Sequence, residues 1–259
     1  MRGTDGMLKK GLSLLEALGG HPDGVGVSRV AKDAELPVST TYRLLNDLVG
    51  SGFASFDPET RRYYLGLKVF ELSRRVSLTK GLSEVALPVM RKLSEEVGES
   101  VFMGVREGAD VLLVERVVGP SRIQVNDNVG SRVPLHSLAQ GKSILAFLPE
   151  DEREELIKGM TLEPETPRTI TDPDKLRDEL ETTRERGWAS VDGEHDEWVR
   201  AIAAPILDAR DRPVAAVAIA APAFRVPMRE LKKHAPTLLN AVREIKVKLP
   251  PSSALLSKT

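Results

Sequence analysis

The stretch from Val27 to Phe53 constrains the fold most, because turn chemistry, capping residues and apolar spacing there all indicate the same motif. A first short helix is predicted over residues 29–34, with Ser28 as its candidate N-cap. Proline disfavours α geometry in the residue before it, so Leu36-Pro37 ends that helix. A second helix follows and ends at Gly50 to Gly52, where glycine permits left-handed backbone. The stretch is therefore predicted to fold as helix, turn, helix.

The second helix has one apolar and one polar face, and Ser39 or Thr40 is its candidate N-cap. The residues predicted to face inward are Leu44, Leu45, Leu48 and Val49. The other face carries Thr40, Arg43, Asn46 and Asp47. A helix-turn-helix places such hydroxyl, guanidinium and amide groups in the DNA major groove. On the motif alone, an ordinary helical hairpin with a solvated polar face fits equally well.

A β-hairpin is predicted directly after the second helix. Its strands are residues 53–56 and 61–65, joined by a turn at Asp57-Pro58-Glu59-Thr60. The returning strand begins with Arg61 and Arg62, followed by two tyrosines, a composition that suits phosphate contact or insertion into a minor groove. An edge hairpin that merely closes the domain is the alternative. The order helix-turn-helix and then basic hairpin favours a winged helix.

Composition limits the class of protein. The 259 residues can form two ordinary domains, and the net charge of −1 gives no global nucleic-acid signature. Residues 1–80, however, hold 12 Lys/Arg and 9 Asp/Glu (net +3), which leaves 25 and 29 (net −4) for residues 81–259. With no cysteine, no signal peptide and no apolar run longer than Val214 to Ala223, we expect a cytoplasmic protein that does not enter a membrane.

The segments outside the winged helix are read from periodicity. A helix over Met7 to Leu18 is predicted to pack through Leu8, Leu12, Leu15 and Leu18. Beyond residue 82, helical segments alternate with β-branched runs at 100–106, 111–117, 188–191, 201–207 and 214–220, and the last of these helical segments is predicted over Pro227 to Lys248. Short turns between several of these strands predict a partly antiparallel sheet flanked by helices, an α+β domain.

The helix-turn-helix and its Tyr63-Tyr64-Leu65-Gly66-Leu67-Lys68 exit resemble the DNA-binding domain of the IclR family of bacterial transcriptional regulators. Segments 134–136, 140–146, 168–171, 186–189 and 201–206 also follow that family's order. The resemblance implies a GAF-like effector-binding domain at residues 82–249, a linker helix at 67–81 that aids dimerisation, and a homodimer or homotetramer. The winged helix is placed at 1–66 and a flexible tail at 250–259.

The predicted partners are double-stranded operator DNA and a small organic acid. The residues expected to meet DNA are Ser28, Ser39, Thr40, Thr41, Tyr42, Arg43, Asn46, Arg61 and Arg62. The resemblance and the predicted helix start near Leu138 place the effector site at Ala139, Gln140, Gly141, Val191, Asp192, Val199 and Ala201. Gln140, Val191 and Ala201 depart from the family's usual residues, and Trp198 stands where glycine is usual. These departures favour a more apolar effector such as an aromatic acid, or a pocket partly filled by Trp198; plain core residues without a ligand are the alternative.

Two other functions stay open. Glu194-His195-Asp196, with Asp192, suggests metal binding or acid–base chemistry, but no second histidine lies at ligand spacing. Gly141-Lys142-Ser143 has histidine where a phosphate-binding loop needs its first glycine. We therefore expect no catalytic residue, metal or cofactor. A small-molecule enzyme, or an adaptor that binds protein through the winged helix, is the alternative to a regulator.

Overall fold

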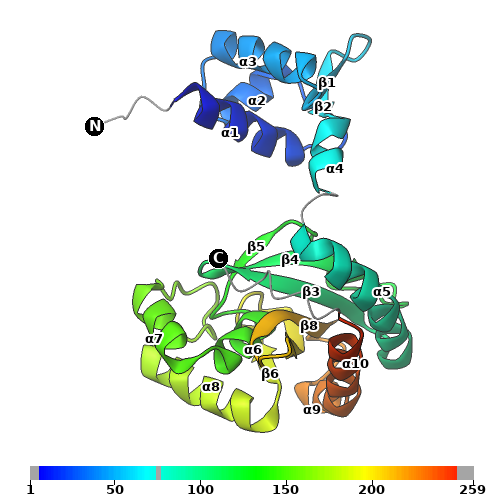
Figure 1. The fold of residues 1–259 in the computed structure, drawn as a ribbon, viewed down its shortest axis with the longest axis vertical. Coiled ribbons are helices and arrows are strands. Elements are labelled where there is room, and N and C mark those ends of the chain that lie inside the picture. Colours follow the sequence, from blue (N-terminus) through cyan, green and yellow to red (C-terminus); the bar gives the residue numbers. More distant parts are fainter. Residues whose placement is uncertain (1–5, 74–76, 250–259) are drawn as a thin grey trace. The chain divides into compact units, whose positions relative to one another are not determined.

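The computed structural model describes residues 6–73 and 77–249, and these fall into two compact units that divide after Val76 (Figure 1). Nowhere in these two ranges is a helix both long and apolar enough to cross a membrane. Of the predicted linker 67–81, α4 (Leu67–Ser73) belongs to the first unit and α5 (Ser77–Val97) to the second, and residues 74–76 between them lie outside the described residues. The predicted tail, 250–259, lies outside the described residues.

The first unit is a three-helix bundle with a hairpin. Its elements are α1 (Met7–Gly19), α2 (Val27–Asp33), α3 (Val38–Gly50), β1 (Ala54–Asp57), β2 (Arg62–Leu65) and α4. The hairpin is antiparallel, with Phe56 opposite Tyr63, and Val25 adds a bridge to Tyr63 on the other side. The helix-turn-helix and the winged hairpin predicted from the sequence are both present.

The predicted helix caps are wrong. Helix α2 begins at Val27 after Gly26, and α3 begins at Val38 after Pro37, so Ser28, Ser39 and Thr40 lie inside their helices. Neither start has a side-chain cap hydrogen bond. Pro37 takes the N-cap position because its fixed φ suits the extended backbone there, and its carbonyl accepts the first helical hydrogen bond.

The predicted apolar stripe of α1 is also wrong in part. Leu14 and Leu18 are buried in a core that includes Leu44 and Leu45 of α3, whereas Leu8 is 77% exposed and Leu12 is 51% exposed. The buried face is the one that packs on α2, α3 and β2, and leucine periodicity along one helix does not identify it.

The second unit is a six-stranded sheet covered on both faces by helices. Besides α5, its elements are β3 (Ser100–Glu107), β4 (Asp110–Val117), β5 (Arg132–Pro134), α6 (Ala139–Phe147), α7 (Glu150–Gly159), α8 (Pro173–Arg186), β6 (Ala189–Asp192), β7 (Val199–Leu207), β8 (Pro213–Pro222), α9 (Met228–Lys232) and α10 (Ala235–Lys248). The strand order is β5-β4-β3-β8-β7-β6. Each adjacent pair is antiparallel, whereas the sequence predicted a sheet that is only partly antiparallel.

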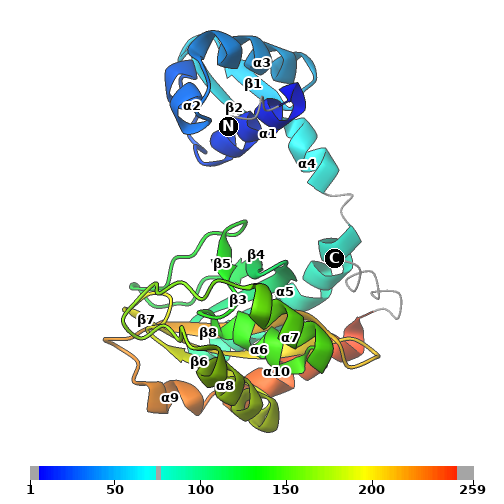
Figure 2. The same cartoon turned by 90° about the vertical axis from the view of Figure 1, so that its left-hand side faces the viewer.

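Helices lie on both faces of the sheet (Figure 2), and side-chain alternation along the central strands divides the core into two layers. On β7, Ile202 and Ala204 face α5 and α10, while Ala201 and Ala203 face α6 and α8. The face of β8 toward α6 is likewise all alanine, at Ala216, Ala218 and Ala220. These small side chains leave space between the sheet and the start of α6, and this is where the pocket described below lies.

Candidate DNA-binding surface and effector pocket

The outer face of α3 presents most of the residues predicted to meet DNA. Ser39, Tyr42, Arg43 and Asn46 are exposed, and Thr40 is half-buried. The Arg43 guanidinium lies at 3.4 Å from the Met7 sulfur of α1 and has no carboxylate partner among the described residues. The first turn and middle of α3 therefore display hydroxyl, phenol, guanidinium and amide groups on one surface, the groups that read base edges and phosphates.

Thr41 does not belong to this surface, and its predicted role in DNA contact is wrong. Its side chain is fully buried, and Oγ1 donates a hydrogen bond of 3.1 Å to the Pro37 carbonyl. A threonine one position along the helix from Thr40 points about 100° away from it, which here is into the core. Its hydroxyl bonds the backbone of the first turn of α3 on the buried side of the helix.

The wing is held by its own turn. Asp57 accepts hydrogen bonds from the Glu59 amide at 2.9 Å and the Thr60 hydroxyl at 2.6 Å. These bonds lower the pKa of Asp57, and the Thr60 bond has the largest effect. Arg61 has a φ of +55°, which turns the chain into β2. Arg61 and Arg62 are exposed, and Arg62 donates to the Asp23 carbonyl at 3.1 Å. A rigid turn thus presents two guanidinium groups.

Ser28 is exposed on α2, beside an ion-paired cluster that fixes this helix. Asp33 accepts hydrogen bonds from His21 at 2.8 Å and from Arg29 at 3.0 Å. The His21 contact is the largest of the effects that lower the pKa of Asp33. Ser28 itself is the second residue of α2, and it stays a predicted DNA contact.

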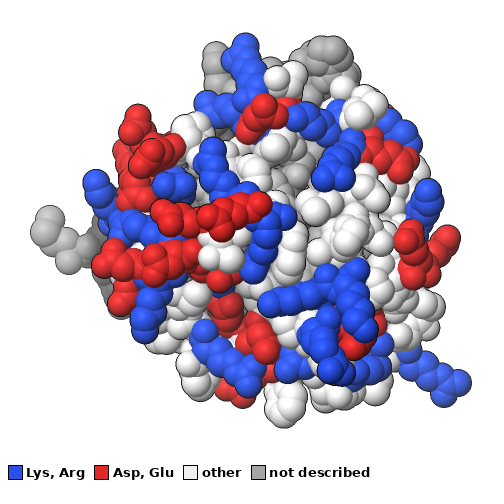
Figure 3. Space-filling model, turned by 90° about the horizontal axis from the view of Figure 1, so that it is seen from below, with Lys and Arg blue, Asp and Glu red and all other residues white. Residues whose placement is uncertain are grey.

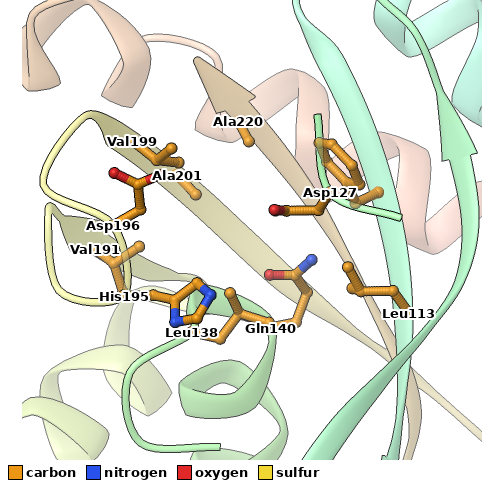
Figure 4. Close-up of a pocket in the computed structure, with 11 residues that line it drawn as sticks. Leu113, Asp127, Leu138, Gln140, Val191, His195, Asp196, Val199, Ala201 and Ala220 are labelled. Atoms are coloured by element: carbon orange, nitrogen blue, oxygen red, sulfur yellow. The ribbon is translucent and has the colours of Figure 1, made fainter. Parts of the chain in front are cut away.

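A small pocket of about 50 Å³ lies in the second unit, between the start of α6 and the alanine face of the sheet (Figure 4). Its apolar lining comes from five elements and the segment before α6: Phe102, Leu113, Leu138, Val191, Val199, Ala201 and Ala220. Its polar lining is Asp127, Gln140, His195 and Asp196. A site that is mostly apolar with a few converging polar groups is the usual form of a small-molecule site.

The carboxylates in the polar lining, those of Asp127 and Asp196, make its formal charge negative. Asp127 points into the cavity from the β4–β5 connection, and His195 and Asp196 lie across from it on the β6–β7 connection (Figure 4). The His195 Nδ1 bonds Glu165 at 2.8 Å, and its Nε2 has no hydrogen-bond partner among the described residues. Burial raises the pKa of Asp127, and this outweighs the opposing effect of His195.

The N-terminus of α6 forms the remaining wall. Leu138 is its N-cap residue, and no side chain caps the helix. The first N–H groups of a helix have no partner within it, and they carry partial positive charge. Gly141 is required here because a Cβ would lie 2.1 Å from the Leu135 carbonyl oxygen. The preceding segment can therefore pass directly against the first turn and shape the pocket wall.

Comparison with known proteins decides the family. Residues 7–58 match the model of the IclR helix-turn-helix domain, and residues 76–247 match that of the bacterial transcriptional regulator IclR C-terminal domain. The chain belongs to the IclR family. It is similar to the transcriptional repressor IclR of Escherichia coli, with 30% identity over 92% of this chain and 88% of that one.

Solved structures of IclR proteins agree over nearly the whole chain. The Thermotoga maritima IclR has a TM-score of 0.79 and 32% identity, covering 93% of this chain and 98% of its own. An IclR homologue from Microbacterium hydrocarbonoxydans, complexed with 4-hydroxybenzoate, has a TM-score of 0.81 and 27% identity, covering 94% and 99%. Members of this family are transcriptional regulators with a helix-turn-helix domain and a C-terminal effector-binding domain.

The structure brings together only part of the effector site that the IclR resemblance predicted. Gln140, Val191, Val199 and Ala201 line the pocket. Three predicted residues do not line it: Ala139, Gly141 and Asp192. Ala139 and Gly141 pack inside the domain. Asp192 is next to Val191 on a strand and so faces the other way, where Arg200 bonds it at 2.6 Å and Arg168 lies at 3.2 Å.

Sequence reasoning missed Phe102, Leu113, Asp127 and Ala220 as pocket residues. They come from β3, β4, β8 and a connection, which meet only in the folded sheet. Period-two alternation on β8 could have identified Ala220, whereas no pattern indicated Asp127. Trp198 is 66% exposed and does not line the cavity, so the predicted filling of the pocket by its indole is wrong.

The acid–base pair around Asp192, Glu194 and His195 that would support the alternative of an enzyme is not assembled. Each side chain has its own partner, respectively Arg200, Lys142 and Glu165. Among the described residues, no group of three or more His, Asp or Glu side chains could hold a metal ion.

A buried ion pair holds the connection that carries His195 and Asp196. Lys142 of α6 is fully buried, and its Nζ donates to Glu194 at 2.5 Å. Burial raises the pKa of Glu194, and Lys142 only partly offsets this. On the other side, Thr166 and Thr169 donate to the Gly193 and Glu194 carbonyls at 2.6 Å each. The pocket's polar rim is thus anchored to α6 from within.

Charge is distributed differently over the two regions. The face shown in Figure 3 carries acidic and basic side chains intermixed, with no continuous field of one sign. Residues 1–80 hold the excess of positive charge, net +3 by the counts above, including the exposed arginines of α3 and the wing. The basic surface suited to DNA is the helix-turn-helix unit.

Proposed function

We propose that this chain is an effector-responsive regulator of transcription that reads its operator through α3 and holds the duplex through the wing. The exposed face of α3, with Arg43 free of a carboxylate partner within the described ranges, carries this proposal. Arg43 reads a base edge in the major groove, with Thr40 beside it, and Arg61 and Arg62 contact phosphates or the minor groove. Ser28, Ser39, Tyr42 and Asn46 add contacts around them.

The regulator acts as a homodimer or as a homotetramer. A single three-helix module reaches few base pairs, so two half-sites supply specificity. The surface of the first unit supports self-association, because it leaves large apolar side chains exposed on α1 and α4: Leu8, Leu12, Leu67, Phe70 and Leu72. Exposed apolar groups at this density mark an interaction surface.

The pocket of the second unit binds a small organic acid, aromatic acids included. The uncapped N-terminus of α6 supports this, since its N–H groups can receive a carboxylate beside Gln140. The IclR homologue complexed with 4-hydroxybenzoate is a relative with such a ligand. Effector binding changes the spacing of the two DNA-binding heads, and so changes operator affinity. The domain has no catalytic role, and the protein works in the cytoplasm.

The test measures binding to the DNA upstream of its own gene. Fluorescence anisotropy with that DNA and with a scrambled duplex, at two salt concentrations, separates specific from non-specific binding. The proposal expects tighter binding to the upstream DNA at both salts and weaker binding to each at higher salt. Equal affinity for both duplexes, repeated with other candidate operators, would point to an adaptor or an enzyme instead.

A further inference from the structure

The pocket contains a hydrogen-bond acceptor, the Asp127 carboxylate, to which none of the described residues donates. Asp127 is fixed through its backbone, because Arg116 donates to its carbonyl at 3.1 Å and to Asn126 Oδ1 at 2.7 Å. Its carboxylate accepts no hydrogen bond from the described residues and points into the cavity (Figure 4). A half-buried carboxylate without a donor carries a desolvation cost that a bound donor would relieve.

The charge of the pocket lining favours a cation near Asp127. The residues around the cavity include two carboxylates, Asp127 and Asp196, and no lysine or arginine. The Arg116 guanidinium, which does not line the cavity, bonds Asn126 Oδ1 and the Asp127 carbonyl. His195 is the one basic side chain of the lining, and Glu165 already bonds its Nδ1. An acid without a further polar group would leave the Asp127 carboxylate without a hydrogen-bond donor.

We propose that the effector is amphoteric: its acid group binds at the N-terminus of α6, and an ammonium group at its other end binds the Asp127 carboxylate. This inference rests on the proposed function and specifies the ligand class of the same pocket. The apolar wall formed by Phe102, Val199 and Ala201 contacts the carbon chain between the two groups. Asp196 at the rim adds attraction for the same cation.

The size of the cavity limits this ligand. About 50 Å³ is several times the roughly 10–15 Å³ that one water needs, so the pocket admits a short chain rather than a large ring system. Gln140 is 3% exposed and projects into the same space between the α6 terminus and Asp127. A short linear or small cyclic amino acid fits the charges and the volume.

Isosteric pairs of acids provide the direct test. β-Alanine, 4-aminobutyrate and 5-aminovalerate are compared with butyrate, valerate and hexanoate, in which a methyl group replaces the ammonium. Titration calorimetry on the full chain measures each affinity. For at least one pair, the amino acid is expected to bind about tenfold more tightly or better, because a charge-assisted hydrogen bond replaces a methyl group against a carboxylate.

Variants then assign the preference to Asp127. Asp127→Asn keeps the shape and removes the charge, and should reduce the preference for the amino acid to about threefold or less. Asp178→Asn removes the same charge from the exposed face of α8 and should leave the preference unchanged. If Asp127→Asn does not fold, Asp196→Asn at the exposed rim should weaken the amino acid selectively.

The outcomes separate this inference from the proposed function. Equal or tighter binding of the alkanoates, or a preference that survives in Asp127→Asn, overturns the amphoteric effector and leaves an organic-acid sensor. Failure of all six compounds to bind overturns it as well, and operator binding, measured separately, then decides whether the regulator itself stands.

Discussion

The buried Lys142–Glu194 pair is predicted to stabilise the second unit strongly, and removing one partner should be far worse than removing both. In Lys142→Met a carboxylate is left largely buried with no cation, and in Glu194→Gln a fully buried ammonium is left with no anion. Breaking such a pair costs about 3–5 kcal/mol, whereas replacing both partners is often nearly neutral. Each single variant should therefore lose about 3–5 kcal/mol of unfolding free energy, and Lys142→Met/Glu194→Gln should recover most of it.

The pH dependence of these losses has a definite sign. Burial raises the pKa of Glu194 above its ordinary 4.5 in the folded protein. A group with a raised folded pKa stabilises fully below its unfolded pKa, and this contribution is lost as pH rises through the folded value. Lys142→Met removes the interaction that lowers this pKa, so the variant's deficit should grow from pH 4 toward pH 8. Glu194→Gln should show no relief on acidification, because an ammonium gains no proton there.

Both tryptophans, Trp188 and Trp198, lie in the second unit, so their fluorescence follows urea unfolding of that unit alone. Lys246→Met breaks the more exposed Lys246–Asp211 pair of 2.7 Å and serves as the control, with little change expected. If the single variants lose no more than the control, or if the double variant loses the sum of both singles, the pair does not stabilise the pocket rim as argued.

Three further predictions concern single residues. Arg43→Ala should weaken operator binding by about 1–3 kcal/mol and leave scrambled DNA nearly unaffected, measured by anisotropy; an equal loss on both would make Arg43 a phosphate contact. Thr41→Val should cost about 1 kcal/mol of thermal stability, through the lost bond to Pro37, and leave operator affinity unchanged; reduced affinity in the folded variant would contradict its burial. Gln140→Ala should widen the cavity and improve calorimetric binding of bulkier acids such as benzoate, and an unchanged order of affinities would mean that Gln140 does not limit pocket size.

Much of the first unit could be predicted because its signals are local. Leu36-Pro37 separates two helices in the structure as predicted, and the turn at Asp57 to Thr60 depends on side chains within three residues of one another. The predictions were wrong where packing or backbone geometry decides which residue caps a helix or which helix face is buried. Pro37 rather than Ser39 is the N-cap of α3, and the face of α1 that is buried depends on where α2 and α3 lie.

The pocket was less predictable because its walls are distant in sequence. The position of Gln140 at a helix start could be read from the chain, whereas Asp127 reaches the cavity only because Arg116 positions its loop. The segment predicted to be helical over Pro227 to Lys248 is two helices, since Lys233 and His234 interrupt it before α10 begins at Ala235. Strand alternation separates Val191 from Asp192, although the resemblance had placed both at the effector.

The central claim is that the pocket of the second unit controls DNA binding by the first. The most direct test measures operator affinity by anisotropy with and without a saturating ligand identified by calorimetry, and measures that ligand's affinity with and without operator. The account predicts a change of about 5–150-fold in operator affinity, with the same factor in the ligand's affinity, as linkage requires. A ligand that fills the pocket and leaves operator affinity unchanged would contradict it.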